Sequence, residues 1–193
     1  MARAGVELRK IGIYGGTFDP IHHGHLILAR EARERLELET IIFVPTAVSP
    51  FKNEPLATVT DRLEMLETAI ESEPGFIIDP IELNRPPPSY TIDTVEAIRG
   101  REGDAELFYL LGQDNVEDLS AWHRFEDLQK LVRFIVLDRT GEQANHPHFV
   151  IQRKIDISAT EIRKRVASNR SIRYLVPAAV EEIIHRRGLY QEN

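Results

Sequence analysis

The stretch Gly15-Gly16-Thr17-Phe18-Asp19-Pro20-Ile21-His22-His23-Gly24-His25 connects a predicted strand to a predicted helix. An apolar run at residues 11–14 precedes it, and residues 26–32 follow with the apolar spacing of a helix. In a parallel α/β unit such a turn lies at the carboxyl edge of the sheet, where the free N–H groups and dipole of the next helix favour anions. Glycines allow backbone N–H groups to approach a ligand closely, and imidazoles add donors that can carry positive charge. The stretch therefore predicts a phosphate-binding turn.

The turn lacks both of the common phosphate-loop patterns, GxGxxG and GxxxxGK[ST]. It contains an HxGH arrangement instead, with His22 and His25 at the ends. A lone His-x-x-His would favour a tight turn with ordinary surface histidines. The whole string, however, resembles the signature GGTFDPxHxGH of the nucleotidyltransferase superfamily at every specified position. In that superfamily the two histidines face the triphosphate, and His23 falls on the unspecified position.

Composition limits the classes of protein that fit this chain. A length of 193 residues suits a single domain, with a core over about residues 9–151 and a C-terminal helix and tail over about 152–193. The net charge of −7 argues against a broad nucleic-acid-binding face, and the absence of cysteine excludes disulfides and thiolate catalysis. No apolar run reaches the length of a signal peptide core or a membrane span, so we expect a cytoplasmic protein without a membrane partner.

Strand and helix patterns alternate along the chain, which predicts an α/β fold. The first helix is expected to end near Leu36, and another is expected over about 92–99. Pro177 and Gly188 are expected to begin and end the last helix. The residues around 149–151 form only a short extended piece. The five main strands are predicted at residues 11–14, 40–44, 76–79, 106–111 and 131–137.

Several single residues allow two interpretations. Lys52, in a proline-containing loop, is either a solvated lysine or a phosphate contact. Asp114 follows a strong predicted strand, where it could hold a ribose hydroxyl, cap the next turn, or do both. Trp122 alone would be interpreted as core, but its position shortly after that strand end favours stacking on a flat heteroaromatic ring.

A second helix start, at residues 157–163, has the character of an anion site. Ser158 or Thr160 can cap it, and Arg163 lies within about the first turn. The simpler interpretation is a capped helix with a surface arginine. The chain also contains His146 and His148, but the spacing of its histidines matches no standard zinc arrangement, so no resident metal centre is expected.

From Ile11 to Tyr190 the sequence resembles the bacterial nicotinate mononucleotide adenylyltransferases. The first turn and the ISxTxIR string at 157–163 are shared by several nucleotidyltransferases. The Ser89-Tyr90-Thr91 string and the spacing from Gly112-Gln113-Asp114 to Trp122 are more specific. Leu175-Val176-Pro177 and the closing Leu189-Tyr190 are also similar.

The resemblance implies a Rossmann-like doubly wound sheet of five main parallel strands with a short C-terminal helical extension. It also implies the reaction of ATP with nicotinate mononucleotide to give deamido-NAD and pyrophosphate, in NAD biosynthesis. Ala159, where many relatives have a second serine, and Phe51, where histidine is common, depart from the pattern. The implied catalytic residues are His22, His25 and Arg163. The implied ATP-binding residues are Gly15, Gly16, Thr17, Phe18, Lys52, Ser158 and Thr160, and the implied mononucleotide-binding residues are Tyr90, Thr91, Asp114, Trp122 and His123.

The residue inventory agrees with this chemistry. A phosphate monoester is mostly a dianion at neutral pH, so the substrate supplies its own nucleophile. The protein must align it with the α-phosphorus and place positive charge around the phosphates, with Mg²⁺ held largely by phosphate oxygens and water. The alternatives are a phosphopantetheine adenylyltransferase, a cytidylyltransferase and a non-catalytic nucleotide sensor. Whether the chain forms a homo-oligomer stays open.

Overall fold

The computed structural model describes residues 8–47, 54–86, 88–141 and 146–191. Within them, one parallel sheet has the strand order β3-β2-β1-β4-β5-β6. The chain builds outward from β1 to β3, then returns to the other side of β1 and continues from β4 to β6. This is the doubly wound order, and it opens a crevice at the carboxyl ends of β1 and β4, because the connections that follow these two strands run to opposite edges of the sheet. The strands are β1 (Lys10–Gly16), β2 (Thr40–Pro45), β3 (Phe76–Ile78), β4 (Glu106–Gly112), β5 (Arg133–Asp138) and β6 (Phe149–Gln152).

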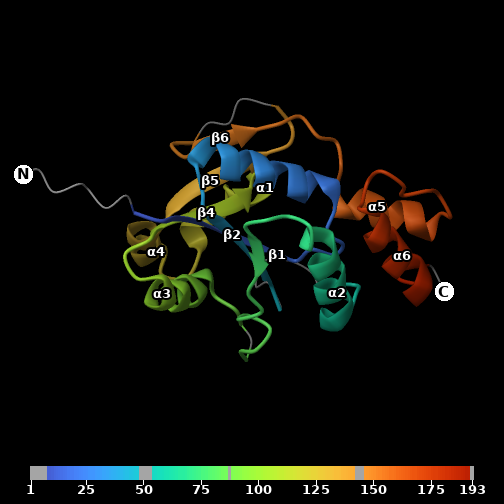
Figure 1. Cartoon of the computed structure of the whole chain (residues 1–193), viewed down its shortest axis with the longest axis horizontal. Helices are drawn as coiled ribbons and strands as arrows, with labels where there is room; N and C mark the ends of the chain where they lie inside the picture. The colour runs from blue at the N-terminus through green and yellow to red at the C-terminus, as the bar shows by residue number, and fades with distance from the viewer. Residues whose placement is uncertain (1–7, 48–53, 87, 142–145, 192–193) are drawn as a thin grey trace, which may run out of the picture.

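Helices cover both faces of the sheet (Figure 1). Helices α1, α2, α5 and α6 pack on one face, and α3 and α4 pack on the other. No helix in the described part of the chain is long and apolar enough to cross a membrane. The helices are α1 (His23–Leu36), α2 (Val59–Ile70), α3 (Thr91–Glu102), α4 (Phe125–Leu131), α5 (Ala159–Ala167) and α6 (Ala178–Arg187), with short 3₁₀ turns at Gln113–Asn115 and Leu119–Ala121.

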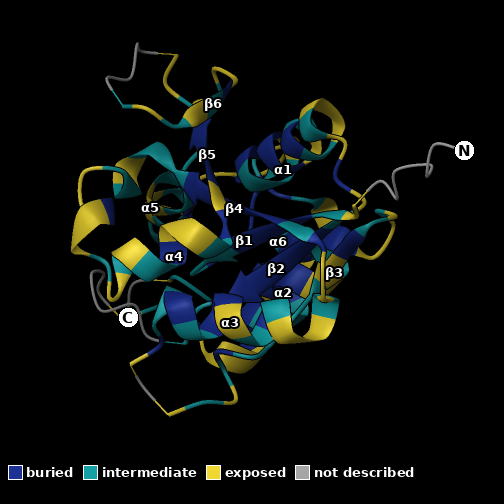
Figure 2. Cartoon of the chain, turned by 90° about the vertical axis from the view of Figure 1, so that its left-hand side faces the viewer, coloured by how far each residue is buried: buried dark blue, intermediate teal, exposed yellow. Residues whose placement is uncertain are grey.

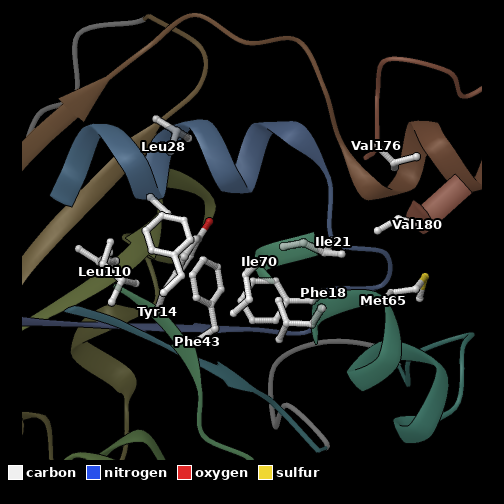
Figure 3. Packing of buried hydrophobic residues seen from close by; sticks show 14 of the residues in the cluster. Tyr14, Phe18, Ile21, Leu28, Phe43, Met65, Ile70, Leu110, Val176 and Val180 are labelled. Carbon is white, nitrogen blue, oxygen red and sulfur yellow. The ribbon is translucent and has the colours of Figure 1, made fainter. Parts of the chain in front are cut away.

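Alternate residues of each strand point to opposite faces, so every central strand contributes to two apolar clusters. Tyr14 of β1 packs with Phe43 and Leu110 beneath α1 and α2, whereas the neighbouring Ile13 packs with Ile42 on the side of α3. Figure 2 shows the sheet as a buried layer between half-buried helices. In the close view of the first cluster, Val176 and Val180 from the C-terminal segment lie near Met65 of α2 (Figure 3).

The predicted α/β fold and its five main strands are confirmed, with one addition. The short extended piece at residues 149–151 is β6, a sixth strand paired in parallel with β5. The last helix begins after Pro177 and ends at Gly188, which has φ 61° in the left-handed region that glycine favours.

The C-terminal segment returns to the beginning of the fold. The backbone N–H of His23 donates to the carbonyl oxygen of Leu175 at 3.0 Å, which joins the start of α1 to the segment before α6. Helix α6 is also joined to α2, because Arg186 pairs with Glu64 at 2.7 Å and Arg187 pairs with Asp61 at 3.0 Å. The tail is therefore packed beside the turn that follows β1.

Candidate active site

A cavity of about 900 Å³ lies where the carboxyl ends of β1, β4 and β5 meet the beginnings of α1 and α5. This is the crevice that the doubly wound order predicts. The cavity brings together nine residues that the sequence assigned to catalysis or ATP binding: Gly15, Gly16, Thr17, Phe18, His22, His25, Ser158, Thr160 and Arg163. Lys52 and Phe51 lie outside the described residues.

The two glycines at the end of β1 are required by close packing. A Cβ atom on Gly15 would overlap the hydroxyl oxygen of Tyr109, and one on Gly16 would lie 2.8 Å from the ring of Phe18. Both distances are shorter than carbon atoms tolerate. The backbone of the turn can therefore lie against a ligand on one side and against aromatic side chains on the other.

His22 and His25 occupy one site but have different properties. Their rings stack with centroids 3.7 Å apart, and the backbone N–H of His22 donates to Nδ1 of His25 at 3.3 Å. An accepting Nδ1 places the proton of neutral His25 on Nε2, where it can be donated to a ligand. Burial, together with the nearby Arg139 and His23, lowers the pKa of His22 to about 3. The expectation that both imidazoles can be positively charged is therefore wrong for His22, which is neutral at pH 7.

Two arginines line the same cavity. Arg163, in the first turn of α5, donates to the carbonyl oxygen of Asp19 at 2.6 Å and to the hydroxyl of Thr160 at 3.3 Å. Arg139, just after β5, donates to the carbonyl oxygen of Ile157 at 2.8 Å. Carbonyl oxygens orient these guanidinium groups, although the carboxylate of Asp19 lies 3.9 Å from Arg163. The cavity therefore holds positive charge suited to phosphate oxygens.

The beginning of α5 forms one wall of this cavity. Of the two capping residues that the sequence allowed, Ser158 is the N-cap, because its hydroxyl oxygen accepts from the backbone N–H of Glu161 at 3.1 Å. Ala159 and Thr160 also line the cavity. Ala159, where the resemblance implies a second serine, thus offers a methyl group here, while the helix N-terminus itself faces the cavity.

A second, narrower cavity of about 100 Å³ adjoins the first. It lies on the side of the sheet covered by α3, and four predicted mononucleotide residues line it: Tyr90, Thr91, Trp122 and His123. Asp114 does not join them. The 3₁₀ turn after β4 places Asp114 on the first cavity, whereas its neighbour Asn115 lines both. The contact of Asp114 with the mononucleotide, which the resemblance implies, stays a prediction.

Aromatic rings shape the second cavity. The rings of Tyr90 and His123 stack with centroids 4.3 Å apart, and Trp122 meets Tyr109 edge-on at 5.8 Å. Trp122 also packs against the core cluster on this face while it lines the cavity. The interpretation as a core residue is therefore confirmed, and stacking on a ligand ring stays a prediction. The hydroxyl of Tyr109 is hydrogen-bonded to Thr91 at the beginning of α3.

Buried polar groups line the inner part of this cavity. Glu82 is 5% exposed and accepts from the hydroxyl of Thr94 at 2.9 Å, and Arg85 donates to the same hydroxyl. Burial raises the pKa of Glu82 to about 7. The hydroxyl of Ser89 is buried and has no hydrogen-bond partner within the described residues. A ligand that enters this cavity therefore meets a donor that the protein itself does not use.

Sequence reasoning missed several residues that line the cavities. Arg139 could have been found, because it follows a predicted strand at the edge of the sheet where Gly112 and Asp114 were sought. Glu82 gave no such signal, and Ser89 was singled out only as part of the Ser89-Tyr90-Thr91 string, because neither residue type indicates burial against a cavity. Among residues 8–47, 54–86, 88–141 and 146–191, no group of three His, Cys, Asp or Glu side chains could hold a metal ion.

Comparisons with known proteins agree on one family. A family model described as "Cytidylyltransferase-like" matches residues 13–165. The chain is 38% identical to "Nicotinate-nucleotide adenylyltransferase" of Bacillus subtilis (strain 168), over 95% of this chain and 100% of that protein. It is 44% identical to "Probable nicotinate-nucleotide adenylyltransferase" of Geobacillus thermodenitrificans, over 94% of this chain and 86% of that protein.

A solved structure shares the fold. It is "Plasmodium falciparum nicotinic acid mononucleotide adenylyltransferase complexed with NaAD", with a TM-score of 0.80 and 21% sequence identity. The match covers 94% of this chain and 97% of that one.

Proposed function

The chain belongs to the nicotinate-nucleotide adenylyltransferases of the cytidylyltransferase-like family, and from this premise we propose that its two adjoining cavities hold the two substrates. The enzyme transfers the adenylyl group of ATP to nicotinate mononucleotide, which gives deamido-NAD and pyrophosphate in NAD biosynthesis. The large cavity beside α1 and α5 is assigned to ATP. The narrow aromatic cavity beside α3 is assigned to the nicotinate end of the mononucleotide.

The observation that carries this assignment is the boundary between the two cavities. Gly15, Gly16, Thr17 and Asn115 line both of them. A phosphate group at this boundary would be within reach of either side. Two substrates bound in the two cavities would therefore meet with their phosphates together, as in-line transfer requires.

The chemistry needs no protein nucleophile. A phosphate oxygen of the mononucleotide attacks the α-phosphorus of ATP, a new P–O bond forms, and the bond from the α-phosphorus to the bridging oxygen breaks. Pyrophosphate leaves with the electron pair of that bond. Negative charge grows on the bridging and non-bridging oxygens in the transition state, so fixed donors and cations lower the barrier.

The proposed roles follow from the positions of these groups. His25 presents an Nε2 proton to the phosphates, while neutral His22 supports it by stacking. Arg163 and Arg139 supply positive charge, and the N-terminus of α5 with Ser158 and Thr160 supplies donors. Mg²⁺ is proposed to enter with ATP, because this ion is usually bound through substrate phosphates and water, and it would neutralise part of the charge on pyrophosphate.

The narrow cavity is suited to an acid rather than an amide. The hydroxyls of Ser89 and Thr91 can donate, and a carboxylate only accepts. A carboxylate can accept from both hydroxyls at once, whereas the N–H₂ group of a carboxamide cannot accept, so one hydroxyl would have to give up its role as donor, which we expect to favour the acid. The face of Trp122 would stack on either ring, since it cannot distinguish the substituent.

The test is a turnover assay with a panel of acceptors. Nicotinate mononucleotide, nicotinamide mononucleotide and 4′-phosphopantetheine are each supplied with ATP, and CTP replaces ATP in a parallel series. We expect ATP with nicotinate mononucleotide to be the preferred pair, with kcat/KM at least about tenfold above the amide. Equal values for acid and amide would contradict the assignment of the narrow cavity. Transfer to no acceptor would contradict the enzyme assignment and favour a nucleotide sensor.

A further inference from the structure

The carboxylate of Asp19, in the turn after β1, accepts hydrogen bonds from two other segments of the chain. It is 5% exposed. Its Oδ2 accepts from the backbone N–H of Leu56 at 2.8 Å, and its Oδ1 accepts from that of Ala57 at 3.1 Å. Leu56 belongs to the wall of the large cavity. Asp19 therefore fixes this wall to the phosphate-binding turn, although a carboxylate beside phosphates is electrostatically unfavourable.

The third partner of this carboxylate comes from the end of the chain. The hydroxyl of Tyr190 donates to Oδ1 of Asp19 at 2.7 Å, across 171 residues of sequence. Burial and the adjacent Asp19 raise the pKa of Tyr190, so its hydroxyl keeps the proton that it donates. Because α6 is also joined to α2 by ion pairs, Tyr190 is held in place beside the turn.

Arg163 lies close enough to compete for the same carboxylate. Its Nη1 atom is 3.9 Å from Oδ2 of Asp19, beyond hydrogen-bond distance, and it donates to the Asp19 carbonyl instead. Arg62, the other cation facing Asp19, is fully buried and already donates to the carbonyl oxygens of Thr17 and Thr46. Arg163 is therefore the cation that can respond when the carboxylate of Asp19 loses a donor.

We propose that Tyr190 is a positioning residue for the triphosphate, because its hydroxyl satisfies Asp19 and so keeps Arg163 directed into the ATP cavity. Without that hydroxyl, the carboxylate of Asp19 loses one hydrogen-bond donor. Arg163 can then move from 3.9 Å into direct contact with the carboxylate and form a close ion pair. The guanidinium would then be withdrawn from ATP. This inference rests on the proposed ATP site, but it concerns a residue at the C-terminal end of the chain that contacts neither substrate.

The test compares Tyr190→Phe with Tyr174→Phe. The first removes one hydroxyl and keeps the ring, and the second removes a hydroxyl from a side chain that is 79% exposed. Calorimetry measures the Kd of each protein for ATP and for nicotinate mononucleotide, and steady-state assays measure both KM values. For Tyr190→Phe we expect Kd and KM for ATP to rise about tenfold while the mononucleotide values stay unchanged. Tyr174→Phe should match the parent in all four values.

A double variant checks the mechanism. Adding Asp19→Asn to Tyr190→Phe removes the charge that attracts Arg163, so ATP affinity should recover relative to Tyr190→Phe alone. Unchanged ATP affinity in Tyr190→Phe would overturn the inference. Equal weakening of both substrates would do the same, because it indicates a general loss of structure, and melting temperatures are recorded for that comparison. If the parent protein binds ATP but transfers no adenylyl group, the proposed function is wrong. The inference about Tyr190 can still be tested in that case, because calorimetry compares the ATP affinity of the parent with that of Tyr190→Phe.

Discussion

The two histidines of the HxGH motif differ in how deeply they are buried, although their rings stack on one another. His22 is the N-cap of α1 and is buried, with a pKa lowered to about 3 by desolvation and by Arg139 and His23. His25 is one turn further along the helix and is half-buried at the cavity. The sequence predicts that both residues face phosphate and can be positively charged, but burial keeps His22 neutral.

The first prediction concerns His25→Ala. Its Nε2 donor should matter most as charge develops on the phosphate oxygens, so kcat should fall about 10²-fold with a smaller change in KM for ATP. Steady-state kinetics with saturating mononucleotide measures both values. His185→Ala, at an exposed histidine on α6, is the matched control and should behave like the parent. A folded His25→Ala protein with the parent's kcat would remove His25 from the mechanism.

The second prediction concerns the pH dependence of stability and Glu82. Its pKa is raised by burial to about 7, above its unfolded value near 4.5. Between these pH values the folded state binds more protons, so the free energy of unfolding falls as the pH rises through this range, by up to about 3 kcal/mol. Urea unfolding at pH 5 and pH 8 measures the effect.

In Glu82→Gln this part of the pH dependence should disappear. Glu67→Gln, at an exposed position of α2, should leave it intact. If the parent and Glu82→Gln lose stability equally between pH 5 and pH 8, Glu82 does not titrate in the folded protein as proposed.

At the scale of elements, α5 places a capped helix N-terminus and a guanidinium group in one wall of the large cavity. Ser158 uses its oxygen to cap the helix, and Arg163 is oriented by the carbonyl of Asp19 and the hydroxyl of Thr160. A fixed fork of donors can then meet two phosphate oxygens at once. Ala159, between these two residues, contributes no hydroxyl to the cavity.

The third prediction follows from that geometry. Arg163→Lys should have a kcat/KM for ATP almost as low as that of Arg163→Ala, because an ammonium group on a flexible side chain cannot contact two phosphate oxygens in a fixed geometry. Arg165→Lys, on the same helix, serves as the control. Comparing kcat/KM for ATP among the three variants measures the effect. Activity near that of the parent in Arg163→Lys would mean that charge alone is required there.

The elements that sequence reasoning found are those with local signals. Strand β1, the turn after it and the capped start of α5 each have a periodicity or motif of their own. Strand β6 was recognised only as an extended piece, because its pairing with β5 is decided by the folded sheet. The position of Asp114 on the first cavity depends on the 3₁₀ turn after β4, and the contact of Tyr190 with Asp19 depends on the whole path of the chain.

At the scale of the molecule, the switch in strand order between β1 and β4 explains why one turn serves two cavities. Helices α1 and α5 lie on one side of the sheet and α3 lies on the other, so each face supplies the walls of one cavity. The turn at Gly15–Thr17 sits at the edge between the faces. A transferase with two substrates needs a separate binding site for each and one place where their reacting groups meet. The two cavities and the turn that lines both of them fit this requirement.

The last prediction tests that separation. Arg139 lines only the ATP cavity and Trp122 lines only the narrow one. Arg139→Ala should raise KM for ATP and leave KM for nicotinate mononucleotide unchanged. Trp122→Ala should raise KM for the mononucleotide by roughly tenfold, because stacking is lost, and leave KM for ATP unchanged. Because the two residues belong to different cavities, each KM of the double variant should equal that of the corresponding single variant. The free-energy changes of the two substitutions should then add to within about 0.5 kcal/mol. Steady-state kinetics with each substrate varied in turn gives the four values. A double variant well outside that limit would mean that the two cavities are coupled through the turn they share, and that the sheet does not isolate one substrate from the other.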